Sequence, residues 1–191
     1  MSQHKITKLM RYDESKPEGA GSALEEKLFL FSLVRMLKPD SIIEIGVSAG
    51  HMTAWLALAL VLNEKGRLIS VDNWSRAHGG QAASSQKAFR RISEVGLHLE
   101  RVVKFVDSDS VEYLKSCPDN SVDMVWIDGD HSFEGARADI DEGSRVAKKV
   151  IAVHDTNQIY DGVRNAIKDI YTESLGFWVK GCRGIWLKDL A

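Results

Sequence analysis

The stretch that decides the fold begins Ser41-Ile42-Ile43-Glu44-Ile45-Gly46-Val47-Ser48-Ala49-Gly50 and ends Arg67-Leu68-Ile69-Ser70-Val71-Asp72. Its first part predicts a short apolar strand, followed by a turn in which Gly46 and Gly50 can adopt dihedrals closed to other residues. Residues 51–62 are almost all apolar and predict a helix that is buried on nearly every face. A strand, a glycine loop, a helix and a second strand ending in an acid are typical of the nucleotide-binding half of a doubly wound sheet.

This unit suits a ligand that carries a polar or anionic group. The free N–H groups of the loop and of the helix N-terminus would face such a group, and Asp72 stands where a carboxylate can accept both hydroxyls of a ribose. The glycine spacing is E-x-G-x-x-x-G, with Glu44 where a dinucleotide-binding G-x-G-x-x-G has its first glycine. The spacing therefore points away from NAD and FAD, and a merely tight strand-to-helix turn is the structural alternative.

The same stretch resembles the first motif of class I S-adenosylmethionine-dependent methyltransferases, and Asp72 matches their second, acidic motif. In that family the glycine loop approaches the methionine part of the cofactor, and the acid binds the ribose. The resemblance therefore implies that S-adenosylmethionine is bound by Glu44, Gly46, Gly50 and Asp72.

A serine hydrolase is a second interpretation of the glycine loop. Residues 46–50 also spell G-x-S-x-G, the nucleophile elbow of α/β-hydrolases, with Ser48 as nucleophile and with His131 and His154 downstream. Hydrolases, however, build several strands before the nucleophile, whereas this loop follows the first evident strand. Their glycine-rich oxyanion segment precedes the serine, whereas His78-Gly79-Gly80 follows it here. The sequence therefore favours the methyltransferase.

Hydrophobic periodicity places the remaining elements on either side of this unit. A helix is expected over 23–37, where Ser22 and Glu25 have the spacing of a capping box, and polar residues 1–22 precede it as a short helix or a tail. Four further helices are expected: over 86–95, directly after the 107–110 segment, from the end of the 127–135 segment to about 146, and over 162–171. Strands are expected over 101–106, 122–127, 149–153, 175–179 and 184–187. This alternation predicts a single α/β domain over 23–191.

Two segments that follow strand ends could reach a ligand. In the loop 73–85, Trp74 could cover the adenine or the acceptor and His78 could touch the substrate, although glycine-paired loops are common without a ligand. Asp109 and Ser110 can cap the free N–H groups of the next helix. Their segment also resembles the one that meets the adenine in methyltransferases, which implies that both residues lie on the adenine side. Capping alone would explain them equally well.

A second motif, at residues 127–135, makes the resemblance to methyltransferases more specific. Residues 127–135 read Ile-Asp-Gly-Asp-His-Ser-Phe-Glu-Gly, and the next strand ends in His154-Asp155. With the first motif, over about 24–170, they resemble small-molecule O-methyltransferases related to macrolide-sugar methyltransferases and cephalosporin hydroxylase-type proteins, the methyltransferase 24 type. The resemblance implies a Rossmann-like, doubly wound α/β fold with a seven-stranded, mostly parallel sheet, an antiparallel last strand and helices on both faces.

The chemistry of methyl transfer accounts for the polar groups at these strand ends. Transfer from a sulfonium to oxygen is an in-line displacement, so an enzyme must align donor and acceptor and lower the acceptor's pKa. Asp128 and Asp155 could hold Mg²⁺ through oxygen ligands, and Asp128 is also expected beside the cofactor. His131 or His154 could accept the proton as a general base. Metal-binding relatives often have Asp where His154 stands, and because imidazole is a poor Mg²⁺ ligand the metal stays open.

Composition limits the partners. The 191 residues, 44% hydrophobic, have room for a full core, and a formal net charge of −2 gives no electrostatic footprint for nucleic acid. Cys117 and Cys182 are far apart and suggest a reducing compartment. Neither a secretory segment nor a membrane-spanning helix is predicted, so a cytoplasmic protein is expected, and the apolar helix 23–37 could form a dimer face.

The function expected from the sequence is methyl transfer from S-adenosylmethionine to a hydroxyl of a small molecule, with or without Mg²⁺. The hydrolase with Ser48 as nucleophile is one alternative. A protein that binds S-adenosylmethionine without catalysis is another, and nothing in the sequence separates it from the enzyme.

Overall fold

A computed structural model describes residues 2–15, 22–75, 77–78, 81–82, 84–157, 161–171, 176–180 and 183–190. Its helices are α1 Ser2–Ser15, α2 Leu24–Leu37, α3 His51–Asn63, α4 Ser85–Glu94, α5 Ser110–Ser116, α6 Phe133–Val146 and α7 Asp161–Ile170, with a 3-10 turn at Leu99–Arg101. Its strands are β1 Ser41–Ile45, β2 Arg67–Asp72, β3 Ala77–His78, β4 Gln81–Ala82, β5 Val103–Asp107, β6 Val122–Ile127, β7 Ala147–His154, β8 Phe177–Val179 and β9 Ile185–Asp189.

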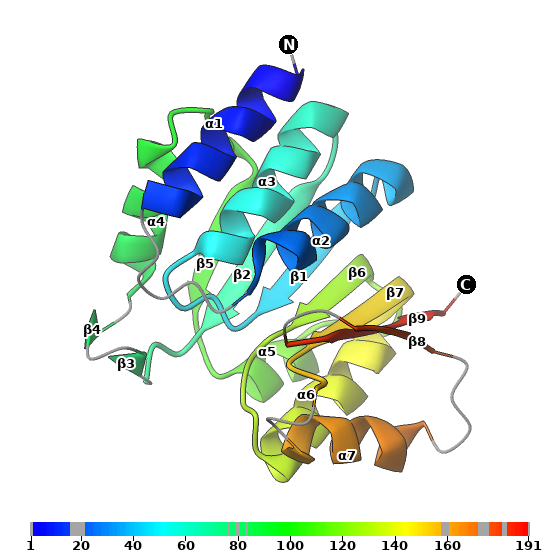
Figure 1. The fold of residues 1–191 in the computed structure, drawn as a ribbon. Helices are drawn as coiled ribbons and strands as arrows, with labels where there is room; N and C mark the ends of the chain where they lie inside the picture. Colours follow the sequence, from blue (N-terminus) through cyan, green and yellow to red (C-terminus); the bar gives the residue numbers. More distant parts are fainter. Residues whose placement is uncertain are drawn as a thin grey trace.

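The main sheet has seven strands in the order β5-β2-β1-β6-β7-β9-β8 (Figure 1). The strands β5, β2, β1, β6 and β7 are parallel to one another, and β9 is antiparallel to both β7 and β8. The chain winds from β1 outward through β2 to β5 and then returns to β6 on the other side of β1. This confirms the doubly wound, mostly parallel sheet with an antiparallel last strand, and it puts the topological switch point between β1 and β6.

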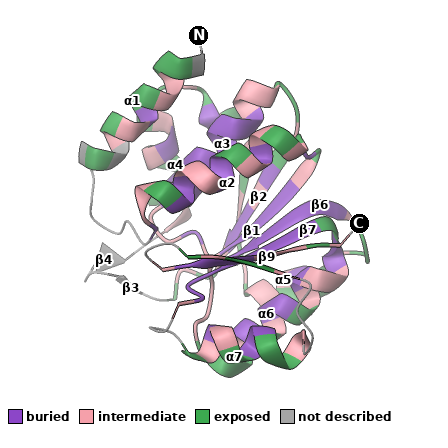
Figure 2. Cartoon of the chain, turned by 45° about the vertical axis from the view of Figure 1, so that its right-hand side comes forward, coloured by how far each residue is buried: buried purple, intermediate pink, exposed green. Residues whose placement is uncertain are grey.

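Helices cover both faces of the sheet. Figure 1 shows α1, α2, α3 and α4 on one face and α5, α6 and α7 on the other. The side chains of two adjacent residues of β1 belong to different hydrophobic cores. Ile42 packs with the first group of helices, and Ile43 packs with the second. All six residues of β6 are buried, as expected for a strand covered on both faces (Figure 2). The carboxyl ends of the strands are thus held at one rigid edge.

The predicted buried helix is confirmed in α3, which lies against the sheet underneath α2. Residues 51–60 are all buried, and Trp55 packs edge-on against Phe31 of α2, with ring centroids 6.0 Å apart. Helix α2 buries Leu30 and Val34 and leaves Met36 77% exposed. The suggestion that this helix forms a dimer face stays a prediction.

Some local features differ from the sequence-based expectation. The N-cap lies at Ala23, one residue later than predicted, and Glu26 rather than Glu25 accepts a hydrogen bond from the Ala23 N–H, at 3.0 Å. Ala23 has no side-chain oxygen to complete a capping box. Strand β5 begins at Val103 and not at 101, because the preceding residues form the 3-10 turn. The loop 73–85 contains the short antiparallel pair β3–β4. Residues 181–182, between the last two predicted strands, lie outside the described residues.

The amino-terminal segment forms a helix that docks on the domain, which resolves one alternative left open by the sequence. Leu9 of α1 is 1% exposed, and the Tyr12 hydroxyl donates to the Glu94 carboxylate at the end of α4, at 2.9 Å. Among the residues that the structure describes, no helix combines the length and apolar character needed to cross a bilayer.

Candidate active site

A pocket opens at the carboxyl ends of β1, β2, β5 and β6, where ligands bind in open α/β sheets. It is lined by Ile45, Gly46, Ser48, Val71, Asp72, Asn73, Ser75, Ser108, Asp109, Ser110, Asp128, Gly129 and Asp130. The structure therefore brings together five of the residues predicted to hold the cofactor, which are Gly46, Asp72, Asp109, Ser110 and Asp128.

The glycine loop needs glycine for its backbone path and for its close neighbours. Gly46 has φ +83°, and a Cβ on it would lie only 2.0 Å from the carbonyl oxygen of Asp128. Gly50 has φ +79° and caps α3. The loop can therefore pass directly against the end of β6, which places the glycine motif next to the second motif.

Asp72 holds the glycine loop in place. Its Oδ2 accepts the N–H groups of Val47 and Ser48, at 2.8 and 2.9 Å. Its Oδ1 accepts the N–H of Trp74, at 2.7 Å. The carboxylate lines the pocket, so it can reach a ligand there. Its acceptance of the two hydroxyls of a ribose stays a prediction.

Glu44 lies behind the pocket and is not among the residues that line it. Its side chain is fully buried, and its Oε2 accepts hydrogen bonds from Ser70, at 2.6 Å, and Thr53, at 2.8 Å. Burial raises the pKa of Glu44 to about 8, against the lowering effect of these two hydroxyls. Any influence of Glu44 on the predicted cofactor therefore passes through the strand and loop that it supports.

The two residues predicted to lie on the adenine side, Asp109 and Ser110, have different hydrogen-bond partners. Asp109 is the N-cap of α5, and its Oδ1 accepts the N–H of Glu112 at 3.0 Å, as the capping interpretation requires. The Ser110 hydroxyl instead donates to Oδ1 of Asp139 on α6, at 2.5 Å. Sequence reasoning missed Asp139, although its place between Ala136 and Gly143 puts it on the inward face of that helix.

The loop after β2 is only partly described. Trp74 has φ +55°, and its indole N–H donates to Oδ1 of Asp107 at the end of β5, at 2.7 Å. This contact turns the ring toward the edge of the sheet, and Trp74 does not line the pocket as it is described. The side chain of His78 lies outside the described residues, so its predicted contact with substrate stays a prediction.

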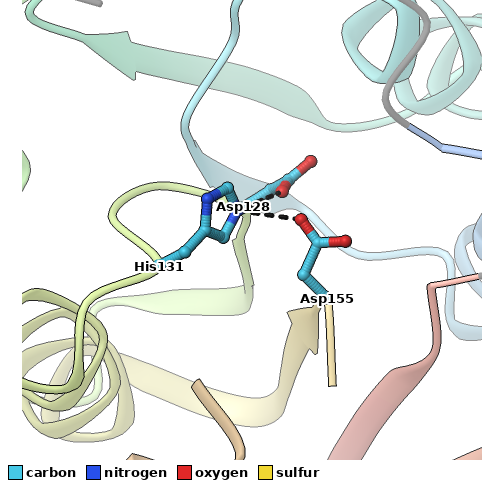
Figure 3. A group of neighbouring side chains, drawn as sticks. All are labelled: Asp128, His131 and Asp155. Carbon is cyan, nitrogen blue, oxygen red and sulfur yellow. Dashed lines mark ion pairs between the residues drawn. The ribbon is translucent and has the colours of Figure 1, made fainter. Parts of the chain in front are cut away.

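Two acids and a histidine meet beside the pocket (Figure 3). Nε2 of His131 lies 2.8 Å from Oδ2 of Asp155 and 3.7 Å from Oδ1 of Asp128. Asp128 follows β6 and Asp155 follows β7, whereas His131 comes from the loop between β6 and α6. Asp128 belongs both to this cluster and to the pocket lining, so it joins the two halves of the site.

A second histidine extends the cluster into the core. Nδ1 of His154 lies 3.2 Å from Oδ1 of Asp128, and its Nε2 lies 3.2 Å from Oε2 of Glu26 on α2. Oε1 of Glu26 also accepts the N–H groups of Arg183 and Gly184, each at 2.8 Å. Glu26 is a residue that sequence reasoning missed, because only the packing of α2 brings it to a strand end more than a hundred residues later in the chain.

The charges of the cluster support one another. Burial alone would lower the pKa of both histidines, but the neighbouring carboxylates outweigh it and raise the pKa of His131 to about 9 and of His154 to about 10. Burial would raise the pKa of Glu26, but hydrogen bonds from His154 and from the backbone lower it to about 2. The two imidazoliums likewise hold the pKa of Asp128 far below its usual range against the effect of burial. Both rings are therefore cations at neutral pH without a metal.

The pKa of His154 leads to a prediction about stability. The ordinary value is 6.5 and the folded value is raised to about 10, so the stabilisation is complete below the ordinary value and is lost as pH rises between these values. We expect the urea midpoint of chelator-treated protein to fall more steeply over this range in wild type than in His154→Gln. Equal slopes for the two proteins would contradict the prediction, because the remaining titrating groups are common to both.

The same residues have the donor set of a cation site. One ligand atom each from Asp128, His131 and Asp155 lies within 4.8 Å of the others. Oδ1 of Asp155 is buried and accepts no hydrogen bond, although Nδ1 of His154 and the Arg183 guanidinium lie 3.6 and 3.7 Å from it. Two carboxylates and an imidazole suit a divalent ion such as Mn²⁺, whereas Mg²⁺ would favour the carboxylate oxygens.

The hydrolase interpretation finds limited support in this geometry. Ser48 has φ +50° and lines the pocket, as a nucleophile elbow would. Both ring nitrogens of His154, however, face the carboxylates of Asp128 and Glu26. Nε2 of His131 faces Asp155. The histidines are thus organised around carboxylates rather than around a serine.

Comparison with known proteins supports the methyltransferase interpretation. Residues 43–156 match a family model described as a methyltransferase domain. This range includes both sequence motifs and every residue of the cluster except Glu26. No curated protein matches the sequence.

Solved structures share the fold at low sequence identity. An O-methyltransferase from Bacillus cereus, in complex with S-adenosylhomocysteine, superposes with a TM-score of 0.69 at 18% identity over 98% of this chain and 91% of the other. The O-methyltransferase TomG from Streptomyces achromogenes, which is involved in tomaymycin synthesis and is in complex with S-adenosylmethionine, gives 0.66 at 20% identity over 96% and 87%. A methyltransferase from Geobacter sulfurreducens gives 0.66 at 15% identity over 98% and 89%.

Proposed function

The chain belongs to this family of methyltransferase domains, and from that premise we propose that it transfers a methyl group from S-adenosylmethionine to a hydroxyl of a small molecule. One observation carries the proposal. Asp128 lines the pocket formed by the glycine loop and Asp72, and it also contacts both histidines. A donor in the pocket and an acceptor at the histidines would therefore meet at this residue.

The pocket offers a place for each part of the donor. The glycine loop at Gly46 would face the methionine part, and Asp72 would accept the ribose hydroxyls. Asp109 and Ser110, at the start of α5, would border the adenine. These positions follow the order of the parallel strands, because β1, β2 and β5 are neighbours whose carboxyl ends meet at one edge.

The transfer itself forms one bond and breaks one. The acceptor oxygen attacks the methyl carbon in line with the sulfur, the carbon–sulfur bond breaks, and S-adenosylhomocysteine leaves. We assign the hydroxyl proton to the imidazole of His131, whose side chain is 19% exposed and lies beside Asp128 of the pocket lining. His154 is 1% exposed and engaged at both nitrogens, so we assign it the orientation of Asp128 and not proton transfer.

A divalent cation fits the two carboxylates, and we propose Asp128 and Asp155 as its ligands. When bound, such an ion would lower the pKa of the acceptor hydroxyl and help to place it. The closeness of the Asp128 and Asp155 carboxylates, with an oxygen of Asp155 that accepts no hydrogen bond, supports this assignment.

Binding and turnover test the proposed function together. We expect S-adenosylhomocysteine to raise the melting temperature, as any ligand of the native state must. We also expect mass spectrometry to find a methylated product in a panel of phenols and sugars. Calorimetry that detected no heat with either S-adenosylmethionine or S-adenosylhomocysteine would contradict the proposal. Binding without turnover on any acceptor would favour a non-catalytic binding protein, and a fluorophosphonate adduct at Ser48 would favour the hydrolase.

Metal removal gives a separate prediction. We expect a chelator to lower the rate of methyl transfer roughly 10-fold or more, because the acceptor then keeps its ordinary pKa, and we expect Mg²⁺ or Mn²⁺ to restore it. Asp155→Asn should remove the response to added metal. Asp161→Asn, at the exposed start of α7, is the matched control and should keep it. A rate that chelation leaves unchanged would remove the metal from the proposal.

A further inference from the structure

Helix α6 carries an acid inside the protein, beside the proposed adenine end of the pocket. Asp139 is 1% exposed, and burial raises its pKa to about 6, with help from the charges of Asp109 and Asp130 and against the hydrogen bond from Ser110. Burying a carboxylate is costly unless it is hydrogen-bonded or paired with an opposite charge. The proposed function so far gives this residue no role.

Asp139 contacts the pocket wall from behind. Its Oδ1 accepts the proton of the Ser110 hydroxyl, at 2.5 Å. Its Oδ2 lies where a Cβ on Gly129 would approach to 2.8 Å, and a backbone hydrogen bond from Asp130 also reaches the carboxylate. Ser110, Gly129 and Asp130 all line the pocket, whereas Asp139 does not. Asp139 can therefore act on a ligand only through these neighbours.

The contact with Ser110 decides what that hydroxyl can offer a ligand. A serine hydroxyl has one proton to donate and two lone pairs that accept. An ionised carboxylate accepts and cannot donate, so the proton of Ser110 is directed inward to Asp139. Only lone pairs remain for the pocket. In this arrangement Ser110 is a hydrogen-bond acceptor toward any ligand.

We propose that Asp139 is a positioning residue that makes Ser110 an acceptor toward the pocket, so that the site selects a 6-aminopurine over a 6-oxopurine. The inference rests on the proposed function, which places a purine beside Ser110. The exocyclic amine of adenine can donate to the lone pair of Ser110. The carbonyl oxygen of hypoxanthine would present a second acceptor, which leaves both groups unpaired, and burying unpaired polar groups weakens binding.

Calorimetry with two nucleosides tests this inference. The probes are S-adenosylhomocysteine and S-inosylhomocysteine, which differ at purine C6 and in the proton that the inosyl compound carries on N1. Binding is measured at about pH 8, where Asp139 is ionised. We expect wild type to bind the adenosyl compound roughly 10- to 100-fold more tightly, the range expected from one buried unpaired group. Asp139→Leu should reduce this ratio to within about 3-fold of unity, because the Ser110 proton is then free to turn toward a carbonyl.

Two further variants separate positioning from a general structural effect. Ser110→Ala should lose the preference as well, and Asp139→Leu combined with Ser110→Ala should behave like Ser110→Ala alone, because Asp139 acts through that hydroxyl. Asp141→Asn, an exposed acid on the same helix, is the matched control and should keep the wild-type ratio.

Each outcome decides the question. If Asp139→Leu keeps the wild-type ratio, or if Ser110→Ala keeps it where Asp139→Leu does not fold, the inference is wrong while the proposed function stands. If wild type binds neither nucleoside, the proposed function fails and this inference fails with it.

Discussion

Replacing His131 with glutamine is expected to lower kcat roughly 100- to 10,000-fold, the range typical of a general base, while the affinity for S-adenosylhomocysteine stays within about 2-fold of wild type. The imidazole is the group that we assign to take the acceptor proton. It contacts Asp128 and Asp155 and is not among the residues that line the proposed donor pocket. Glutamine keeps the approximate size of the side chain but cannot take a proton.

The pH dependence of the same reaction provides an independent check. The acids raise the pKa of His131 to about 9, and only the neutral ring can accept a proton. In chelator-treated protein kcat/KM should therefore rise with pH and level off near this value. His131→Gln should lack this rise.

An exposed histidine supplies the control for this variant. His98 has a 68% exposed side chain at the amino end of the 3-10 turn, so His98→Gln should leave both kcat and the pH profile unchanged. A loss of less than about 10-fold in His131→Gln, or a parallel loss of cofactor affinity, would show that His131 is not the base.

Replacing Asp72 with alanine is expected to weaken binding of S-adenosylhomocysteine by roughly 100-fold or more, the order expected when charge-assisted hydrogen bonds are removed from a buried site. The carboxylate already accepts three N–H groups, from Val47, Ser48 and Trp74. A carboxylate has about four acceptor positions, so two ribose hydroxyls would have to replace one of these bonds. Cofactor binding should therefore change the exposure of the glycine loop.

The neighbouring strand offers a matched control for Asp72. Asp107 ends β5 directly opposite Asp72 in the sheet register, and it is exposed and does not line the pocket. We expect Asp107→Ala to bind S-adenosylhomocysteine as wild type does. Hydrogen exchange at Val47 and Ser48 should change on binding in wild type and in Asp107→Ala but not in Asp72→Ala. Equal losses in the two variants would mean that the ribose does not lie at Asp72.

The sequence predicted the sheet and much of the site because both depend on local patterns. Alternating apolar segments place the strands, and acids or histidines that follow those segments must gather at one edge once the strands are parallel. For this reason the sequence alone predicts that Asp72, Asp128 and Asp155 lie at the same edge. Gly46 could be expected because its turn needs a positive φ.

Sequence reasoning failed where a side chain's role depends on the packing of distant elements. Glu26 and Asp139 lie on helices whose spacing shows an inward face but not the partner on the other side of it. The start of α2 shows the same limit: the N-cap lies one residue later than predicted, and Glu26 contacts His154 and the backbone of Arg183 as well as Ala23.

The amino-acid sequence was sufficient for the order of strands and helices, the glycine loop and the acids that follow the strands, because short-range periodicity and backbone dihedrals are local properties of a chain. The pairing of charges across the molecule required the folded arrangement. Glu26 meets His154 and Asp139 meets Ser110 because packed helices bring those side chains within hydrogen-bonding distance. The raised pKa values of His131 and His154 likewise depend on the folded arrangement, because Asp128, Asp155 and Glu26 lie a few ångströms from the rings.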